Sequence, residues 1–435
     1  MKVEFVKLGI NGEGIGYVDH KPVFCPGVLP GETAEVRITE RRPSYYKAEC
    51  EKILKQAKSR RKSSCGVQQY CGGCALMHMD YHEQLVWKKR LLEEALFKYG
   101  NVKRTLIRDI HPSPDWLGYR NQCKIPLGTS DGKLVGGMYQ PGSNRFQTVH
   151  DCRIHDPLVE ETKKRVLDVL NEHGCTAYDR SKETGMRFLV IRSVDGKSQV
   201  TLVTGRDRLS DSLVQDLTRI PSVVSVMQSV NTDRSALGIF GTACRCLAGE
   251  PVLAFEQSGL SLTLSPEAFF QLNRRAAMEL YAMAVSKIDK CDTLVEAYAG
   301  IGLMSMMAKD KAKQIWGIES VPSAVTDAKR IAEANGITNI RWLSMDAADG
   351  LKRISLNETI DALLVDPPRS GMDDAMLEAI ASIQPKKIIY ISCNPATLGK
   401  NLKELKHHYQ VRTVIPYDLF PMTPHVESIT VLERG

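Results

Sequence analysis

Cys393 stands shortly after an apolar run, residues 388–391, and before the turn-forming pair Asn394 and Pro395. A thiol at the carboxyl end of a buried strand lies where open α/β sheets bind their ligands. In its thiolate form such a side chain is a nucleophile. Free cysteines are also among the most often buried residues, so an inert core thiol is the alternative. This pattern alone leaves both roles open.

A glycine turn, Gly300 and Gly302, follows the apolar run 293–297 and precedes a helical pattern. Glycine lets a ligand approach the backbone closely, and the first turn of a helix offers unpaired N–H groups. Glu319 comes about twenty residues later, where a carboxylate can accept hydrogen bonds from ribose hydroxyls. Because the third glycine of a dinucleotide site is missing, the pattern favours a smaller nucleoside such as S-adenosylmethionine. A solvent-exposed acid at a strand end is the alternative for Glu319.

Asp366 and the two prolines after it follow another apolar run, residues 362–365. Consecutive prolines stiffen a loop, and a loop at the carboxyl end of a strand lies at the ligand-binding edge of a sheet. An Asp-Pro-Pro sequence can also be an ordinary turn. Its position between Glu319 and Cys393 favours one site that contains all three residues.

A group of cysteines forms a second candidate site. Three of its members are close in the sequence and the fourth is distant, a pattern that suits a 4Fe-4S cluster or a zinc ion with four thiolate ligands. Unliganded thiols are the third possibility. Two histidines nearby, His78 and His155, are expected to be structural. The four cysteines are Cys65, Cys71, Cys74 and Cys152.

The elements that must hold these residues follow from the periodicity of the chain. From about residue 250, apolar runs alternate with helical patterns, which predicts an open, mostly parallel sheet. Strands are expected at 293–297, 314–318, 340–343, 362–365, 387–391 and 429–432, and helices at 302–310, 322–336, 372–382 and 396–407.

Upstream, five short β-rich runs within residues 1–57 are separated by Gly and Pro turns, which predicts a five-stranded barrel of the oligonucleotide-binding type. The region 105–245 mixes strands and helices. We therefore expect a multidomain α/β protein: a β-barrel (1–57), a central α+β domain with the cysteine group (58–245) and a C-terminal Rossmann-like domain (246–435). Between and within these we expect a linker at 60–64, amphipathic helices at 81–99 and 157–172, and paired strands at 189–194 and 199–204.

The formal net charge of +7 is concentrated in one segment, residues 37–62. This segment holds ten Lys or Arg residues and three Glu residues, and the difference of seven equals the charge of the whole chain. Tyr45 and Tyr46 lie within it. Basic side chains interleaved with aromatic ones are typical of a surface that binds nucleic acid. A solvated charged face is the alternative.

Length and composition limit the class of protein. The chain has 435 residues, of which 43% are hydrophobic and 25% charged, as in a globular protein of two or three domains. No apolar run is long enough to span a bilayer, and the N-terminus lacks a signal-peptide pattern. We expect a cytoplasmic protein with no membrane association, in which the 12 cysteines are thiols, metal ligands or nucleophiles and not disulfides.

Taken together, these segments resemble the S-adenosylmethionine-dependent RNA uracil-5-methyltransferases. Residues 265–273 resemble the segment before the family's cofactor domain, and residues 1–57 resemble a TRAM domain, so the resemblance covers essentially the whole chain. Departures occur at Glu296 and Ala299, where Asp and Cys are usual, and at Asn401 and Met422. The motifs that carry the resemblance are residues 296–302, 366–369, 392–398 and 420–427.

The resemblance implies a role for each site residue. Cys393 is expected to be the nucleophile and Glu427 the general base, with His425 as a second choice for the base. The four cysteines are expected to hold a 4Fe-4S cluster with a structural or RNA-positioning role. The residues expected to contact the cofactor or the target base are Gln271, Tyr298, Glu319 and Asp366.

The implied reaction is chemically consistent. Carbon 5 of uracil is a poor nucleophile, but addition of a thiolate to carbon 6 makes an enolate that can attack the methyl sulfonium. A base must then remove the proton from carbon 5 so that the thiol can leave. The architecture favours 23S rRNA as the substrate of a monomeric enzyme. A tRNA uridine-54 methyltransferase is the first alternative, and a non-catalytic RNA-binding iron–sulfur protein is the alternative from another class.

Overall fold

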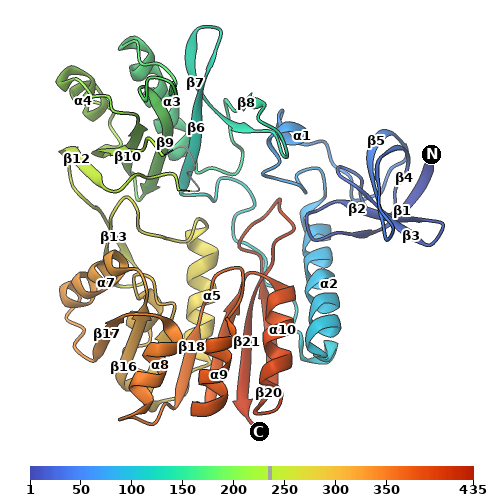
Figure 1. Cartoon of the computed structure of the whole chain (residues 1–435), viewed down its shortest axis with the longest axis vertical. Helices are drawn as coiled ribbons and strands as arrows, with labels where there is room; N and C mark the ends of the chain where they lie inside the picture. Colours follow the sequence, from blue (N-terminus) through green and yellow to red (C-terminus); the bar gives the residue numbers. More distant parts are fainter. Residues whose placement is uncertain (234–237) are drawn as a thin grey trace.

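The computed structural model describes residues 1–233 and 238–435, which form three parts (Figure 1). The first part is a closed β-barrel with the strand order β1-β2-β3-β5-β4, as the sequence predicts. Val3, Phe5 and Val23 fill its interior. Its strands are Lys2–Leu8 (β1), Gly14–Val18 (β2), Lys21–Cys25 (β3), Thr33–Arg41 (β4) and Tyr46–Lys55 (β5).

The segment after the barrel is anchored, although residues 60–64 were expected to be a linker. The Arg60 guanidinium donates to the Glu32 carboxylate, with an Nη2–Oε2 distance of 2.6 Å, and Glu32 is fully buried. A long-range ion pair of this kind cannot be read from a local run of basic residues. It fixes the start of the cysteine segment on the barrel.

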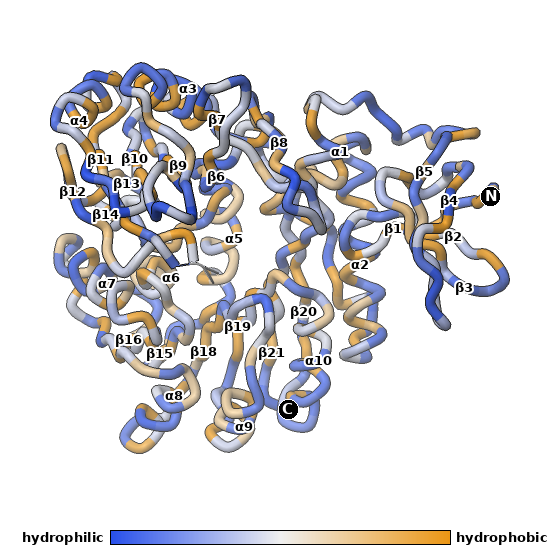
Figure 2. Tube along the Cα trace, turned by 45° about the horizontal axis from the view of Figure 1, so that its top comes forward, coloured by the Kyte–Doolittle hydropathy of each residue, from blue (hydrophilic) through white to orange (hydrophobic). Residues whose placement is uncertain are grey.

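The expected amphipathic helix near residues 81–99 is present as α2. It begins at Tyr81, and the preceding residue Asp80 caps it, because the Asp80 side chain accepts a hydrogen bond from the His82 N–H. Figure 2 shows hydrophobic and hydrophilic residues mixed along this helix, as expected when one face is buried. The helices of this segment are Gln68–Cys71 (α1) and Tyr81–Gly100 (α2), followed by the 3₁₀ turn Arg104–Leu106.

The central part is a seven-stranded sheet with the order β12-β11-β10-β9-β6-β7-β8. The expected strand pair is confirmed, because β9 and β10 are antiparallel neighbours. The helix expected at 157–172 is also found. The elements are Gln122–Ser130 (β6), Lys133–Tyr139 (β7), Phe146–Thr148 (β8), Pro157–Glu172 (α3), Met186–Val194 (β9), Lys197–Thr204 (β10), Asp211–Thr218 (α4), Val223–Val230 (β11) and Cys244–Gly249 (β12).

The C-terminal part carries the second seven-stranded sheet, with the order β17-β16-β15-β18-β19-β21-β20. Its first five strands are parallel, and only β21 runs in the opposite direction, because it pairs antiparallel with both β19 and β20. This confirms the expected open, mostly parallel sheet. The elements are Leu253–Gln257 (β13), Leu260–Leu264 (β14), Arg274–Ser286 (α5), Cys291–Ala297 (β15), Leu303–Met307 (α6), Ala312–Glu319 (β16), Pro322–Ala334 (α7), Ile340–Ser344 (β17), Ala347–Ser355 (α8), Ala362–Val365 (β18), Asp374–Ile383 (α9), Lys387–Ser392 (β19), Pro395–Leu405 (α10), Tyr409–Tyr417 (β20) and Glu427–Arg434 (β21).

All the strands and helices expected in this part occur, but the sequence missed β13, β14, α5, α8 and β20. The edge strand β20 contains Arg412 and Pro416, which depart from an alternating apolar pattern. Its pairing with β21 decides its conformation. The domain boundaries near residues 57 and 245 stay a proposal, and β12 continues the central sheet across the second of them. Among the described residues, none of the helices has the length and apolar character needed to cross a membrane.

Helix α2 joins the parts by packing along α10 of the C-terminal sheet (Figure 1). The two helices approach closely at Gly100 and Gly399. A Cβ atom built on Gly399 would lie 2.9 Å from the Cβ of Tyr99 and 3.2 Å from the Ala95 carbonyl oxygen. A larger residue would therefore push the helices apart.

A buried ion pair completes this junction. The Lys88 ammonium on α2 donates to Asp418 Oδ1 at 2.6 Å and to the Phe420 carbonyl at 3.0 Å, and both charged side chains are fully buried. Gln84, one turn earlier, accepts a hydrogen bond from the Met422 N–H at 2.9 Å. These contacts fix the loop between β20 and β21, which we call the 418–426 loop.

Replacing Lys88 with Ala would leave the Asp418 carboxylate buried without its cation. We expect this variant to lose about 3–5 kcal/mol of the free energy of unfolding, because an unpaired buried charge is strongly unfavourable. The exposed Lys98 on the same helix is the matched control, and Lys98→Ala is expected to change stability by no more than about 0.5 kcal/mol. Urea unfolding followed by circular dichroism measures both. Equal losses in the two variants would contradict this role of Lys88.

Candidate active site

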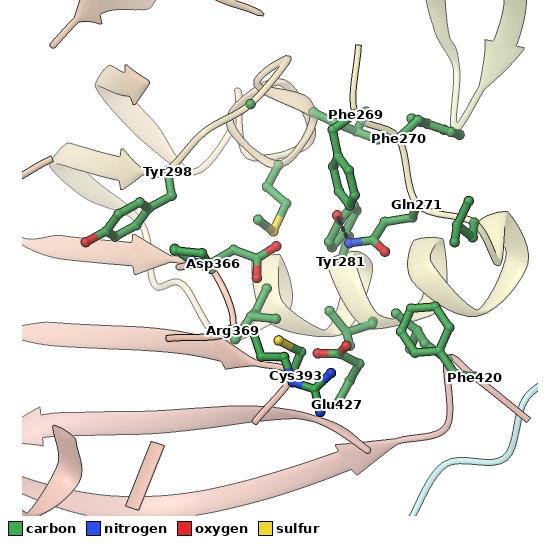
Figure 3. A pocket seen from close by; sticks show the side chains of 18 of the residues that line it. Phe269, Phe270, Gln271, Tyr281, Tyr298, Asp366, Arg369, Cys393, Phe420 and Glu427 are labelled. Atoms are coloured by element: carbon green, nitrogen blue, oxygen red, sulfur yellow. Dashed lines mark hydrogen bonds between the residues drawn. The ribbon is translucent and has the colours of Figure 1, made fainter. Parts of the chain in front are cut away.

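One cavity of ≈ 830 Å³ lies at the carboxyl ends of β15, β18 and β19. Its walls come from the loop before α5, the turn between β15 and α6, the end of β16 and the 418–426 loop. Figure 3 shows this cavity with five of the residues that the sequence assigned to the site. All six of those residues line it: Gln271, Tyr298, Glu319, Asp366, Cys393 and Glu427.

The turn after β15 has an unusual backbone that exposes its N–H groups. Tyr298, Gly300 and Gly302 all have positive φ angles, of 62°, 55° and 73°. A Cβ atom on Gly302 would lie 1.9 Å from the Trp342 ring, so only glycine fits there. The Gly300 N–H donates to Glu319 Oε2 at 2.9 Å, which ties the turn to the acid at the end of β16.

Glu296, a departure from the family pattern, is accommodated by helix α6. Its buried carboxylate accepts hydrogen bonds from the Ser305 N–H, at 2.7 Å, and from the Ser305 hydroxyl. Burial raises the pKa of Glu296 to about 8. Another departure, Asn401, accepts from the Met372 N–H at 3.0 Å and from the Tyr390 hydroxyl at 2.7 Å. Both residues are satisfied in the fold.

Strand pairing brings Cys393 and Glu427 together. Ser392 of β19 pairs with Ser428 of the antiparallel β21. The next residue toward the cavity is therefore Cys393 after β19 and Glu427 on β21. Figure 3 shows the thiol and the carboxyl group next to each other, with the Arg369 side chain beside them. Residues more than thirty positions apart in the chain therefore share one reaction space.

The acids of this space have shifted pKa values. Burial raises the pKa of Asp366 to about 7. Burial and then the Asp366 charge raise the pKa of Glu427 to about 8, while Arg369 opposes the shift. Burial, followed by Glu427 and Asp366, raises the pKa of the Cys393 thiol to about 11, and Arg369 again opposes. Burial in the cavity thus favours the protonated, neutral forms of the thiol and the two carboxyl groups. The Arg369 charge favours the ionised forms of Cys393 and Glu427.

Arg369 is a site residue that the sequence reasoning did not single out. It is the last residue of the 366–369 motif, so its place beside Asp366 in the sequence could have indicated that it belongs to the site. His425 also lines the cavity, but burial, followed by Arg369 and Lys88, lowers its pKa. A histidine whose basicity is reduced in this way is a weaker base than Glu427.

The segment before α5 forms another wall, which includes an exposed aromatic side chain. Gln271 Nε2 donates to the Tyr281 hydroxyl oxygen at 3.1 Å. Phe269 lines the cavity although it is 71% exposed, whereas its neighbour Phe270 is buried. Figure 3 shows the Tyr298 hydroxyl pointing away from Cys393, so Tyr298 contributes to the far wall and not to the reactive group.

The four cysteines come together beside this cavity. Burial and then the nearby thiols of Cys152, Cys71 and Cys65 raise the pKa of Cys74 to about 12. In residues 1–233 and 238–435, however, no group of three or more His, Cys, Asp or Glu side chains is arranged to hold a metal ion.

The two nearby histidines have other partners. His78 Nδ1 lies 2.8 Å from the Gln68 amide nitrogen, and His155 Nδ1 lies 2.6 Å from Glu160 Oε1. Glu160 Oε2 also accepts a hydrogen bond from the Cys152 N–H at 3.1 Å. These contacts fix the chain around Cys152.

Two acids outside the basic segment 37–62, Glu32 and Asp80, offset part of its net positive charge. Half of its cations form ion pairs, which neutralise part of their charge: Arg37 with Glu49 and Glu51, Arg42 and Lys47 with Glu40, Arg60 with Glu32, and Arg61 with Asp80.

Comparison with known proteins agrees with this geometry. Residues 249–435 match the tRNA (uracil-5-)-methyltransferase family and residues 1–50 match the TRAM domain. A protein of Bacillus cereus named "Uncharacterized RNA methyltransferase" is 34% identical over 442 residues, which cover 99% of this chain and 96% of the relative. The chain belongs to the S-adenosylmethionine-dependent RNA uracil-5-methyltransferase family. The resemblance seen in the sequence is thereby confirmed.

Further matches extend over the whole of this methyltransferase. A Listeria innocua protein, also named an uncharacterized RNA methyltransferase, is 33% identical over 431 residues, covering 97% of this chain and 95% of the relative. The crystal structure of Pyrococcus abyssi tRNA (uracil-54, C5)-methyltransferase in complex with S-adenosyl-L-homocysteine aligns with a TM-score of 0.79. It is 22% identical and covers 99% of this chain and 100% of that one, so the two proteins share their fold.

The raised pKa of Glu427 predicts a pH-dependent effect on stability. Between its ordinary pKa of 4.5 and about 8, the unfolded chain ionises at this residue while the folded chain keeps the proton. The folded state therefore loses stability as the pH rises through this window. We expect Glu427→Gln to be more stable than the parent protein at pH 8, with the difference vanishing near pH 4.

Urea unfolding of both proteins at these two pH values measures the effect. The exposed Glu404 on α10 is the control, since Glu404→Gln should show no such pH dependence. A stability difference for Glu427→Gln that is the same at both pH values would contradict the expectation.

Proposed function

We propose that this methyltransferase transfers a methyl group to carbon 5 of a specific uridine in 23S rRNA. The observation that carries the proposal is the single cavity that collects Cys393, Glu427, Asp366 and the glycine turn with Glu319. A thiol, a carboxyl base and a nucleoside-sized pocket are the groups that this reaction requires.

The glycine turn and Glu319 fit the nucleoside end of the cofactor. The Gly300 position is open, with no atom within 4 Å of a built Cβ, so a ligand can lie against the backbone there. Glu319 is held by N–H donors of Gly300 and Val321, which orient its carboxylate for ribose hydroxyls. S-adenosylmethionine, when bound, supplies an electrophilic methyl group.

The reactive residues then act on the target uracil. The Cys393 thiolate adds to carbon 6, which places negative charge on the ring. Carbon 5 then forms the new bond to the methyl group while the bond between that methyl group and the cofactor sulfur breaks, its electron pair remaining on sulfur. Glu427 takes the proton from carbon 5, after which the bond between sulfur and carbon 6 breaks and the thiolate is restored. A base with a pKa near the working pH suits this step. Asp366 provides a hydrogen-bonding edge for the uracil, which must leave its stack to enter the cavity.

Arg369 supports the first step electrostatically. Burial, followed by the two nearby acids, raises the pKa of the Cys393 thiol, so it holds its proton tightly. The Arg369 guanidinium favours the thiolate, as does the N-terminus of α10, which begins two residues after Cys393.

The substrate has two candidates. The combination of a TRAM barrel with a group of four cysteines supports 23S rRNA, by resemblance to the rRNA enzymes of the family. A tRNA uridine at position 54 is the second candidate, because the Pyrococcus abyssi enzyme named for that position shares the fold over 99% of this chain.

We also propose that Cys65, Cys71, Cys74 and Cys152 hold a 4Fe-4S cluster. Three cysteines close in the sequence and a distant fourth, with thiols near enough to raise the pKa of Cys74, suit such a cluster. Bound there, the cluster would cross-link the segment after the barrel to the central part of the chain. Its role is structural or RNA-positioning, because the reaction at Cys393 requires no electron transfer.

Cys393→Ala removes the nucleophile while leaving the RNA-binding surfaces unchanged. We expect this variant to lose methyl transfer completely and to bind RNA like the parent protein. Transfer of labelled methyl groups to purified 23S rRNA and to tRNA, followed by mapping of the modified nucleotide, tests the activity and chooses between the substrates. Methylation by the Cys393→Ala variant would contradict the mechanism, and labelling of tRNA alone would select the second substrate.

Glu427→Gln is the matched variant, because it retains the thiol and lacks the base. It is expected to accumulate a covalent complex with RNA that survives denaturing electrophoresis, whereas Cys393→Ala forms none. A non-catalytic RNA-binding protein would form no such complex and transfer no label in any variant.

The cluster proposal predicts a metal content. Anaerobically purified protein is expected to contain about four iron and four sulfide per chain with a visible absorbance band, and Cys152→Ala is expected to lose it. Elemental analysis measures iron and zinc together. Cys175, which lies outside the group, provides the control variant Cys175→Ala. Stoichiometric zinc without iron would overturn the cluster assignment.

A further inference from the structure

A second cavity of ≈ 1410 Å³ lies between the barrel and the cysteine segment. The barrel contributes the aromatic side chains of Phe24 and Tyr45, and the segment after it contributes Arg61 and Lys62. The reaction proposed above uses none of these residues. The second cavity is therefore distinct from the active-site cavity, and the proposed reaction does not explain it.

The turn of the cysteine group borders both cavities. Gly73 lines the active-site cavity, whereas Gly72 and Ala75, on either side of it, line the second one. Gly72 has a φ of +69°, and a Cβ atom there would lie 2.3 Å from the Pro141 ring, so the turn is thin and closely packed. A chain that passes over this turn can enter both cavities.

The second cavity has the chemistry of a nucleotide site. The Phe24 and Tyr45 rings are half-buried, 5.7 Å apart and nearly perpendicular, which leaves part of each ring surface available for a stacked base. Arg61 is more than half exposed, although it also contacts Asp80 at 3.2 Å. Within the described part of the chain, the exposed Lys62 has no ion-pair partner, so its ammonium is available for a phosphate.

The acids in this cavity are already engaged. Glu13 accepts a hydrogen bond from the Asn11 N–H at 3.0 Å, and Glu49 pairs with Arg37. The Glu13 carboxylate keeps its charge, but four cations, Lys47, Arg60, Arg61 and Lys62, line the cavity against these two acids. The excess of cations and the two aromatic rings favour an anionic ligand that contains a ring, such as a nucleotide.

The position of this cavity relative to the active site is fixed by packing. A Cβ on Gly12, in the loop between β1 and β2, would lie 2.7 Å from the Ala75 Cβ and 3.7 Å from Pro424, so this loop touches both the cysteine turn and the 418–426 loop. Leu8, Leu29, Leu76, Met79 and Trp87 form one apolar cluster between the barrel, the cysteine segment and α2.

We infer that the second cavity binds an unpaired nucleotide of the same RNA strand whose target uridine enters the active-site cavity. Tyr45 provides the stacking surface, Lys62 contacts a phosphate, and the strand crosses the cysteine turn between the two sites. The assignment of the target uridine rests on the proposed function. The subsite makes recognition depend on the length of single-stranded RNA around the target.

The test compares two RNA probes with the holoprotein purified with its metal: a fluorescein-labelled single-stranded oligouridylate and the labelled trinucleotide UpUpU. Tyr45→Ala is expected to raise the dissociation constant of the long probe by about five- to one-hundredfold and to leave that of the trinucleotide unchanged. Tyr45→Phe should retain the affinity. Tyr17, an exposed tyrosine of the same barrel that lies outside the cavity, gives the control Tyr17→Ala.

Lys62 is tested by the salt dependence of binding to the long probe. Lys62→Ala is expected to reduce the slope of the logarithm of affinity against the logarithm of salt concentration by about 0.7, the value for one phosphate contact on a single strand. Lys2→Ala, on the far strand β1, should leave the slope unchanged. Unfolding temperatures of all variants verify that they are folded.

The inference is overturned if Tyr45→Ala behaves like Tyr17→Ala, or if it weakens the trinucleotide as much as the long probe. These measurements require no methyl transfer. Absence of methylation in all RNAs, together with a length-dependent effect of Tyr45→Ala, would therefore refute the proposed function and retain the nucleotide site. Methylation of an RNA substrate, together with no effect of Tyr45→Ala on binding of the long probe, would retain the proposed function and refute the nucleotide site.

Discussion

The buried ion pair between Lys88 and Asp418 is the contact on which the active site depends most. Its partners are 330 residues apart in the chain, and both are fully buried. Two charges removed from water are stable only when they remain paired, so helix α2 and the 418–426 loop must stay together. That loop leads directly into β21, whose first residue is Glu427. The loop before the proposed base is thus held in part from outside the domain that carries it.

The same loop collects contacts from every part of the molecule. The Leu76 N–H donates to the Met422 carbonyl at 2.9 Å, the Tyr119 hydroxyl to the Pro421 carbonyl at 3.0 Å, and Asn273 to the Leu419 carbonyl at 3.0 Å. The cysteine segment, the chain before β6 and the start of α5 are therefore all hydrogen-bonded to this loop beside the cavity. Rigid support of this kind suits a reaction that must align a thiol, a base and a methyl donor.

The cavity holds two buried acids whose pKa values are raised, so their ionised forms are unfavourable there. Asp366 and Glu427 are close enough for the charge of one to raise the pKa of the other, and burial raises both. A fold selected for stability alone would not collect buried acids in this way. The arrangement becomes useful when a base with near-neutral pKa must accept a proton from carbon 5, and Arg369 limits the penalty by opposing the shifts at Glu427 and Cys393.

Much of the fold and the candidate site could be predicted from local patterns. The barrel strands, the parallel strands and the ends at which Glu319, Asp366 and Cys393 stand follow from periodicity, because apolar alternation and turn residues act over a few positions. The resemblance to a family added Glu427 and Gln271, which no local pattern marks. Local patterns failed at β20 and at residues 60–64, where pairing with β21 and the Arg60–Glu32 ion pair decide the conformation.

The sequence by itself determined which groups could perform the chemistry: one thiol, three acids, a glycine turn and a set of four cysteines. Only the tertiary structure decided how they meet. It placed Glu427 opposite Cys393 through the pairing of β19 with β21, and set the cysteine turn between two cavities. It also paired half of the basic side chains of residues 37–62 with carboxylates. The reason is physical, because burial, charge pairing and packing depend on residues far apart in the chain, which no local pattern records.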